Sequence, residues 1–78
     1  MFYVYIIQNE AGIHYKGFTE NLERRLFEHQ NSLGRYTKDK GPWVLVYSQK
    51  YETKREALIE EKRLKRLNVK SLEKLILG

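Results

Sequence analysis

The sequence predicts an α+β domain in which a small three-stranded antiparallel sheet is flanked by helices, in the order β-β-α-β-α-α. Two short runs rich in aromatic and β-branched residues open the chain, and a turn segment separates them. A third such run lies in the middle, and helical patterns follow the second and third runs. With 78 residues the chain is expected to form one domain over residues 1–78, near the lower size limit for folding unaided.

The first two runs, residues 2–8 and 13–18, are predicted to pair as an antiparallel hairpin. The intervening Asn-Glu-Ala-Gly at 9–12 supplies residues that suit a turn. A helix is predicted over 20–31, because Thr19 can cap its first turn and acidic residues lie near the positive end of its dipole.

Residues 32–41 are polar, contain two glycines and a Lys-Asp-Lys cluster, and are predicted to form a loop. A third strand is predicted over 43–47, which is too apolar to be exposed on both of its faces. Trp43 at its start is expected to pack in the core or at its rim rather than to stack on a base.

Two helices are predicted after the third strand. Thr53 and Glu56 have the spacing of a capping box, and the helix that they begin is expected to run to about residue 67. Asn68 can terminate this helix, and Ser71 can cap a short last helix that continues through residue 77.

The charge of the chain favours a polyanionic partner. Fifteen Lys and Arg against ten Asp and Glu give a formal charge of +5 and a pI near 9.6. Such a balance is typical of small domains that bind nucleic acid, although basic residues can also serve solubility alone. A domain of this size is expected to place its chemistry in a shallow surface groove, since it buries too little surface for a roomy internal site.

Composition also excludes some classes of site. The chain has no cysteine, which rules out disulfides and thiolate metal sites. No apolar run approaches the roughly 20 residues that a membrane span needs, and no signal-peptide pattern opens the chain. The sequence therefore predicts a cytoplasmic protein that does not contact a membrane.

The helix predicted over 20–31 places a guanidinium and an imidazole on one face. Leu22, Arg25, Leu26 and His29 follow the i, i+3, i+4, i+7 pattern of a single helical stripe. Because an uncompensated guanidinium is expensive to bury, Arg25 needs an anionic partner or a position at the edge of a groove.

The next helix carries a carboxylate on its apolar face. Ala57, Leu58 and Leu64 define the stripe, and at about 100° per residue Glu61 falls inside it. Glu60 lies close to the same face, so helical geometry alone does not choose between the two glutamates.

These residues together resemble the GIY-YIG nuclease family, specifically its small stand-alone bacterial members. Tyr3-Val4-Tyr5 stands where the family has its first motif and Tyr15-Lys16-Gly17 where it has the second. The steps of ten residues to Tyr15 and then to Arg25 fit, as does the Arg-x-x-x-His that ends at His29. The segment from Glu56 to Glu61 resembles the one that carries the metal-binding glutamate, which favours Glu61 over Glu60.

The resemblance implies a nuclease that hydrolyses phosphodiester bonds in DNA, or alternatively RNA, and leaves a 5′ phosphate. It further implies a role in DNA repair or processing and one divalent ion, Mg²⁺ or Mn²⁺, with Glu61 as the protein ligand. An ion held by one carboxylate and water suits Mg²⁺, which dehydrates reluctantly. The alternative for Glu61 is a surface ion pair with Lys65 at i+4.

The same resemblance assigns catalytic roles to four side chains. Tyr15 would activate the attacking water, with Tyr5 beside it, and nearby cations would favour the ionised phenol. Arg25 would hold the scissile phosphate through two parallel N–H contacts; its alternative is a salt bridge to a glutamate, for example Glu61. His29 would relay a proton or contact phosphate, or else be a satisfied polar histidine near the helix end.

Nucleic-acid contacts are expected from Lys16 and from the basic loop segment Arg35-Tyr36-Thr37-Lys38, which could follow a backbone and stack one base. A solvated connector is the equal alternative for this loop. Phe18 stands where repair-incision relatives have a lysine, so that contact is absent here.

Two other functions stay open on the sequence: a module that binds nucleic acid without cutting it, and a domain that joins a protein partner. The sequence favours DNA over RNA and leaves the oligomeric state open.

Overall fold

The computed structural model describes residues 1–31 and 37–78. Over these residues the chain forms three strands and three helices: β1 (Phe2–Asn9), β2 (His14–Thr19), α1 (Leu22–Gln30), β3 (Trp43–Tyr51), α2 (Lys54–Lys65) and α3 (Val69–Leu77). The predicted order β-β-α-β-α-α is confirmed.

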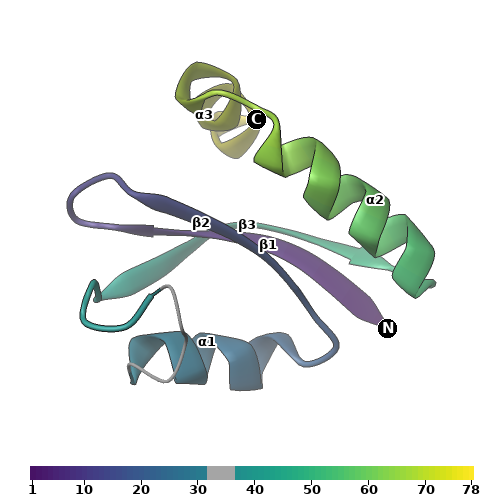
Figure 1. Ribbon diagram of the computed structural model, residues 1–78, viewed down its shortest axis with the longest axis horizontal. Helices are drawn as coiled ribbons and strands as arrows, with labels where there is room; N and C mark the ends of the chain where they lie inside the picture. Colours follow the sequence, from purple (N-terminus) through teal and green to yellow (C-terminus); the bar gives the residue numbers. More distant parts are fainter. Residues whose placement is uncertain (32–36) are drawn as a thin grey trace.

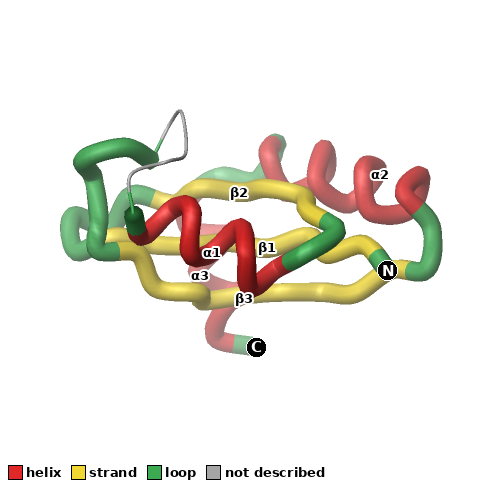
Figure 2. The backbone as a smooth tube through the Cα atoms, turned by 90° about the horizontal axis from the view of Figure 1, so that it is seen from below, coloured by secondary structure: helices red, strands yellow, loops and turns green. Residues whose placement is uncertain are grey.

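The strands form one antiparallel sheet in the order β2-β1-β3, so β1 pairs with a neighbour on both sides. Helix α1 covers one face of this sheet, and α2 and α3 cover the other (Figure 1). Viewed from the α1 side, α1 lies in front of β1, and α2 emerges beyond the β2 edge (Figure 2). The predicted three-stranded antiparallel sheet flanked by helices is thus confirmed.

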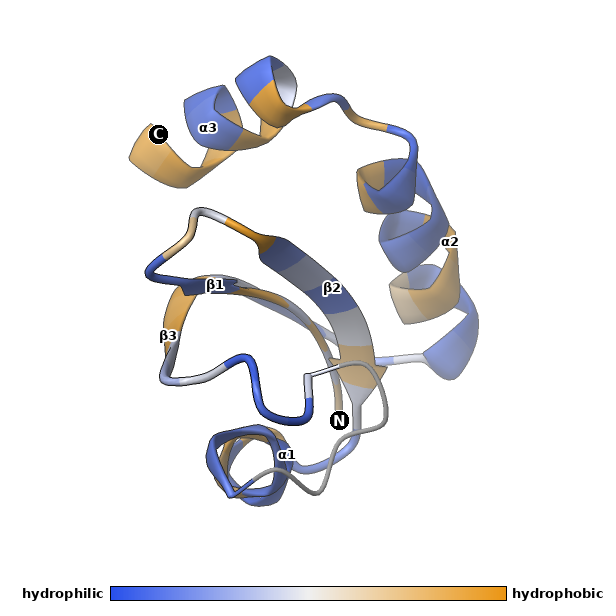
Figure 3. Ribbon diagram, turned by 60° about the vertical axis from the view of Figure 1, so that its left-hand side comes forward, coloured by the Kyte–Doolittle hydropathy of each residue, from blue (hydrophilic) through white to orange (hydrophobic). Residues whose placement is uncertain are grey.

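Alternation along β1 builds a separate apolar cluster on each face. Val4 and Ile6 pack with Ala57, Leu64 and Leu72 from α2 and α3. Figure 3 shows the hydrophobic colours of α3 on the side nearest the sheet. Fully burying an aliphatic side chain contributes about 1.5–3 kcal/mol, so this cluster supplies much of the driving force for folding.

The opposite cluster contains aromatic residues as well as aliphatic ones. Tyr5 and Ile7 of β1 pack with Trp43, and Leu22 and Leu26 of α1 cover them. Trp43 is 3% exposed, which confirms its predicted place in the core. Because Tyr5 is buried at the centre of this cluster, its hydroxyl group needs a hydrogen-bond partner.

Two predicted helix caps are wrong. Asn21, not Thr19, caps α1 by accepting from the amide of Arg24 at 3.0 Å. The Thr19 hydroxyl is already engaged with the main chain of Asn21, in the turn that ends β2. Asn68, not Ser71, caps the last helix and accepts from the Ser71 amide at 2.8 Å, so α3 begins earlier than predicted.

The capping box of α2 is confirmed. The Glu56 amide donates to the Thr53 hydroxyl at 3.2 Å, and that hydroxyl donates to the Glu56 carboxylate at 2.8 Å. This contact fixes the start of the helix that carries Glu61.

Strand β3 differs from its prediction in length and exposure. It continues to Tyr51, and its register with β1 shifts between Ile6 and Ile7. Val44 is 62% exposed and Leu45 is 37% exposed, so the expectation that this run cannot be open on both faces is wrong at its start. The reason is that β3 is an edge strand, and the register irregularity removes this end from regular packing. Across the described ranges, no helix combines the length and apolarity that crossing a membrane would require.

Candidate active site

The side chain of Tyr5 extends from the central strand over Gly17 of β2, which is its cross-strand partner. A Cβ at Gly17 would lie 2.5 Å from the Tyr5 hydroxyl and 3.0 Å from the ring of Tyr15. Real Cβ atoms do not approach that closely, so glycine is what allows the two phenols to meet here. The centroids of the two rings are 6.3 Å apart.

The partner of the buried Tyr5 hydroxyl is His29, which lies in the last turn of α1. The Tyr5 Oη and His29 Nε2 atoms are 2.7 Å apart, and His29 is 2% exposed. The imidazole also lies 5.0 Å from the Tyr15 ring, centroid to centroid. The structure therefore brings both predicted tyrosines together with the predicted histidine.

Burial sets the protonation of this pair. Burial, and then the positive charge of Arg25, lower the pKa of His29 to about 4. Burial raises the pKa of Tyr5 to about 12; the charge of Tyr15 adds to this rise, and Arg25 opposes it. At neutral pH the pair is therefore an uncharged imidazole beside an uncharged phenol.

Arg25 lies at the mouth of the same cluster. Its guanidinium donates to the Glu28 carboxylate at 2.9 Å, and it lies close enough to Tyr5 and Tyr15 to interact electrostatically with both phenols. These acceptors raise the pKa of Arg25, Glu28 foremost. About 30% of the Arg25 side chain is exposed, so a phosphate can reach it. The alternative for Arg25, a salt bridge to a glutamate, is confirmed, but its partner is Glu28 at i+3 on the same helix and not the suggested Glu61.

The two glutamates that helical geometry left open pair with different basic residues of α2. Glu60 forms a double contact with Arg63 at 2.5 and 2.7 Å. The bond from Arg63 holds the pKa of Glu60 below its usual range.

Glu61 instead acts on the tyrosine cluster. Burial is the main cause of the raised pKa of Tyr5, and the negative charge of Glu61 adds a smaller contribution. It also pairs with Lys65 at 3.5 Å, which is the i+4 contact named above as its alternative. About 19% of the Glu61 side chain is exposed, and the long ion pair leaves the carboxylate open to another cation.

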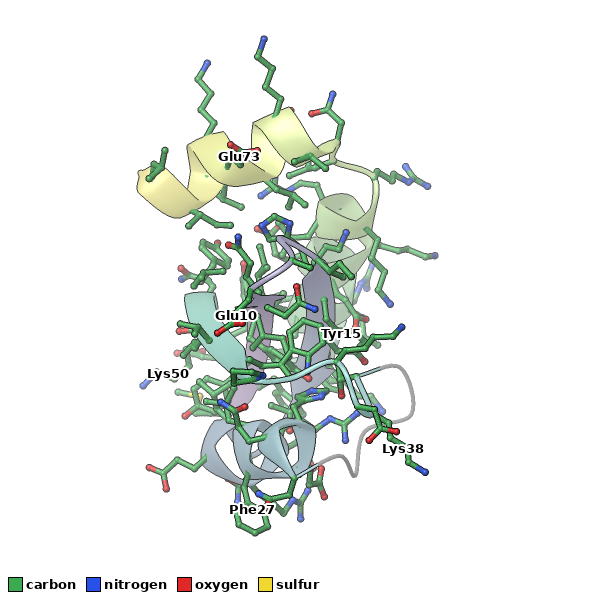
Figure 4. All side chains as sticks on the ribbon, turned by 90° about the vertical axis from the view of Figure 1, so that its left-hand side faces the viewer. Glu10, Tyr15, Phe27, Lys38, Lys50 and Glu73 are labelled. Carbon is green, nitrogen blue, oxygen red and sulfur yellow. The ribbon has the colours of Figure 1, made fainter. Side chains whose placement is uncertain are left out.

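The residues predicted to contact nucleic acid lie on different parts of the molecule, and two of them are outside the described residues. Lys16 pairs with Ile6, whose side chain packs toward α2 and α3, so Lys16 lies on the face of β2 opposite Tyr15. Lys38 is exposed and extends outward from the segment before β3 (Figure 4). Arg35 and Tyr36 lie outside the described residues.

One buried residue of the site, Thr37, could not be predicted from the sequence. Thr37 is 1% exposed, and its hydroxyl lies 2.7 Å from His29 Nδ1. The Trp43 indole donates to the Thr37 carbonyl at 3.1 Å. Thr37 stands in a polar loop without periodicity, where only its basic neighbours drew attention. A threonine six residues before the predicted strand that begins at Trp43 carries no signal that would distinguish it from a turn residue.

The order of these residues along the chain matches a known family. The family model described as GIY-YIG catalytic domain matches residues 1–74. The chain belongs to this family. GIY-YIG domains are nuclease domains that generally use a divalent metal, which implies nucleic acid as the substrate class.

Individual relatives agree with the family match. The chain is 37% identical to a UPF0213 protein of Staphylococcus saprophyticus over 95% of this chain and 92% of the relative. It is 44% identical to a UPF0213 protein of Clostridium perfringens over 86% of this chain and 73% of that protein. The solution NMR structure of a UPF0213 protein from Bacillus halodurans superposes with a TM-score of 0.64 at 35% identity, covering 97% of this chain and 83% of that one.

The donor set fits one type of metal that such a nuclease would use. Within residues 1–31 and 37–78, no three His, Asp or Glu side chains group closely enough to enclose an ion. A partly exposed single carboxylate, Glu61, is compatible with Mg²⁺ or Mn²⁺ that keeps most of its water, and it does not suit an ion held in a closed cage.

Proposed function

We propose that this GIY-YIG domain hydrolyses phosphodiester bonds in DNA, with RNA as the alternative substrate, in DNA repair or processing in the cytoplasm. The observation that carries the proposal is the cluster in which Tyr5 bonds to His29 beside Tyr15, with the partly exposed Arg25 at its mouth. A partly exposed guanidinium beside two phenols can donate N–H groups to an incoming anion.

Arg25 would bind the scissile phosphate. A guanidinium donates two parallel hydrogen bonds to phosphate oxygens and opposes the negative charge that grows in the transition state. Glu28 competes for the same donors at 2.9 Å, so substrate binding would exchange one anion for another. The net gain depends on the phosphate being held by further groups.

Tyr15 would be the group that accepts a proton from the attacking water. Tyr5 is less suited to that role, because its pKa of about 12 keeps its proton in place and it is fully buried. Tyr15 is only partly buried and lies on the edge strand β2, where solvent can reach it. The two tyrosines would therefore have different roles: Tyr15 as the base and Tyr5 as a hydrogen-bonding support.

Glu61 would hold the divalent ion. When bound, Mg²⁺ or Mn²⁺ supplies Lewis-acid stabilisation of charge on the phosphate oxygens and the leaving group. Lys65 would then release the carboxylate, because its 3.5 Å contact is long and the lysine side chain is exposed.

Exposed and partly exposed cations would bind the flanking backbone. Lys38 borders the α1 side of the site, and Lys16 lies on the side of β2 that also faces the helix of Glu61. The outer face of α2 adds Lys54, Arg55 and Lys62 around an open hollow of about 550 Å³ that Glu61 also lines. Contacts of this kind to phosphates give salt-sensitive affinity with little sequence preference.

The test is cleavage of labelled single- and double-stranded DNA and of matched RNA, with Mg²⁺, with Mn²⁺ and with chelator. Glu61→Gln is expected to abolish cleavage while binding in chelator persists, since only the metal ligand is removed. Glu73→Gln is the matched control, because Glu73 is an exposed glutamate on α3, on the other helix of that layer.

Cleavage by Glu61→Gln at the rate of the unmodified protein, or cleavage that survives chelator, would contradict the metal role. Salt-sensitive binding with no cleavage of any substrate would instead favour the non-catalytic binding module. A protein that does not bind nucleic acid at moderate salt would point to the protein-interaction alternative.

A further inference from the structure

The outer face of α2 carries an open hollow that Glu61 helps to line. Its volume is about 550 Å³, and its described lining residues all belong to this helix: Lys54, Arg55, Leu58, Ile59, Glu61 and Lys62. We propose that this hollow binds one unpaired nucleotide of the substrate, with the base on Leu58 and Ile59 and the neighbouring phosphates on the cations. The proposal rests on the proposed hydrolysis and names the form of nucleic acid that the site takes.

Two aliphatic side chains of the hollow are open to solvent. Leu58 is 40% exposed and Ile59 is 60% exposed, whereas Ala57 and Leu64 of the same helix are buried. Leu58 and Ile59 are consecutive, about 100° apart around the helix, so they form one apolar surface. The faces of a nucleic-acid base are flat and apolar, and proteins hold an extruded base against aromatic or aliphatic side chains. An apolar surface among cations therefore suits a base.

The three cations of the hollow are free to bind an anion. All three are exposed, and no ion pair among the described residues engages them. The other basic residues of α2 differ, because Arg63 pairs with Glu60 and Lys65 pairs with Glu61. Unpaired positive charges around an apolar surface are complementary to a nucleotide, which joins an apolar base to negative phosphates.

Glu61 connects the hollow to the proposed chemistry. Leu58 and Glu61 are three residues apart, so their side chains are neighbours on one face of the helix. A base on Leu58 therefore places its own nucleotide beside the ion that Glu61 would hold. Helix α2 lies beyond the β2 edge of the sheet, so a strand that leaves the hollow over this edge continues toward Tyr15 of β2 (Figure 2).

A base can reach Leu58 and Ile59 only when it has left the stack of a duplex. In a matched duplex the neighbouring bases cover both faces, and extrusion must first break pairing and stacking. A single strand, or an unpaired stretch beside a duplex, offers base faces without that cost. The hollow therefore selects unpaired nucleotides, whereas its cations alone would bind any strand.

Charge argues against two other occupants of this surface. Each copy of the chain carries a formal charge of +5, and pairing two α2 surfaces would bring unpaired cations face to face. An acidic protein would match the cations but would place carboxylates beside Glu61. A phosphate that shares a divalent ion with Glu61 avoids this repulsion.

Binding to two oligonucleotides of equal charge tests the site without requiring cleavage. One is a short deoxythymidine strand, and the other is an abasic strand with the same number of phosphates. Fluorescence anisotropy in chelator measures both affinities. The unmodified protein is expected to bind the thymidine strand about 10-fold more tightly, because the abasic strand has no base to place on the apolar surface.

Variants separate the apolar part of the hollow from the charged part. Leu58→Gln combined with Ile59→Gln is expected to weaken binding of the thymidine strand about 10-fold and of the abasic strand by less than about 2-fold, since only the base contact is lost. Lys62→Gln should weaken both strands equally, because it removes a phosphate contact. Val69→Gln is the matched control: Val69 is 59% exposed on α3, outside the hollow, and its loss should change neither affinity.

Equal affinity of the unmodified protein for the two strands would overturn the proposal, as would a double variant that weakens both strands equally or neither. If the double variant does not fold, Ile59→Trp decides. An indole stacks on a base better than an aliphatic chain does, so this variant should tighten binding of the thymidine strand alone, and unchanged binding would overturn the proposal. Failure to bind either strand at moderate salt would overturn it as well and favour a protein occupant.

Cleavage distinguishes failure of this proposal from failure of the proposed function. A single strand should be cut about 10-fold faster than the same sequence in a matched duplex, because no base has to be extruded. Equal rates on the two substrates would overturn the preference for unpaired nucleotides and leave the hydrolysis standing. Base-dependent binding without cleavage of any substrate would support the hollow and contradict the proposed function.

Discussion

The depressed pKa of His29 makes a quantitative prediction about stability and pH. In the unfolded chain the imidazole has its ordinary pKa of 6.5, and in the folded protein the pKa is about 4. Between these values the unfolded state binds more protons, so stability is complete above about pH 6.5 and falls as the pH falls toward 4. Integrated over both equilibria, lowering the pH from about 7 to about 5 should cost about 2 kcal/mol, and the whole effect approaches about 3 kcal/mol at lower pH.

Urea unfolding at several pH values measures this effect, with His29→Gln as the comparison. Glutamine does not titrate, so the variant should be less stable near pH 7 but nearly flat down to about pH 5. The lowered pKa values of Glu28 and Glu60 act in the same direction only below their ordinary value of 4.5, outside this window. Equal losses of stability in the two proteins between about pH 7 and pH 5 would refute the assignment of a buried, neutral His29.

Three further predictions concern packing and charge. Gly17→Ala should destabilise the protein by about 1–3 kcal/mol in urea unfolding and abolish cleavage, since its methyl group overlaps the Tyr5 hydroxyl; an unchanged midpoint would mean that the phenol can move aside. Leu64→Ala should cost about 2–5 kcal/mol by the same assay, whereas Leu58→Ala, 40% exposed, should cost far less; similar losses would contradict the core described above. Arg25→Lys should slow cleavage about 100-fold in a gel assay, because an ammonium cannot donate the two parallel hydrogen bonds of a guanidinium. Full activity of this variant would contradict the binding of the phosphate by Arg25.

Much of the fold follows from the sequence pattern. The element order depends on runs of β-branched and aromatic residues and on helical stripes, and both are local properties. The shared face of Arg25 and His29 is likewise a matter of spacing, and the structure places both against the tyrosines. The N-cap of α1 could not be predicted from the sequence, because Thr19 and Asn21 are both good cap residues and only the turn that ends β2 decides between them.

The remaining parts of the site depend on contacts between distant segments. Helical periodicity puts Glu60 and Glu61 close to the same stripe, and only the folded structure distinguishes them, by pairing Glu60 with Arg63 and Glu61 with Lys65. The contact of Thr37 with His29 joins the segment before β3 to α1, and the sequence offers no local signal for such a contact.

The sheet lies between the phenols and the carboxylate that would act with them. Tyr5, Tyr15 and Arg25 belong to the α1 side, while Glu61 arrives on a helix held to the other side by Leu64 and its neighbours. Detachment of α2 and α3 from β1 would therefore withdraw the carboxylate while the aromatic half remained assembled. Hydrogen exchange that is faster in α2 than in α1 would reveal such an inactive form, which a measurement of whole-chain unfolding would overlook.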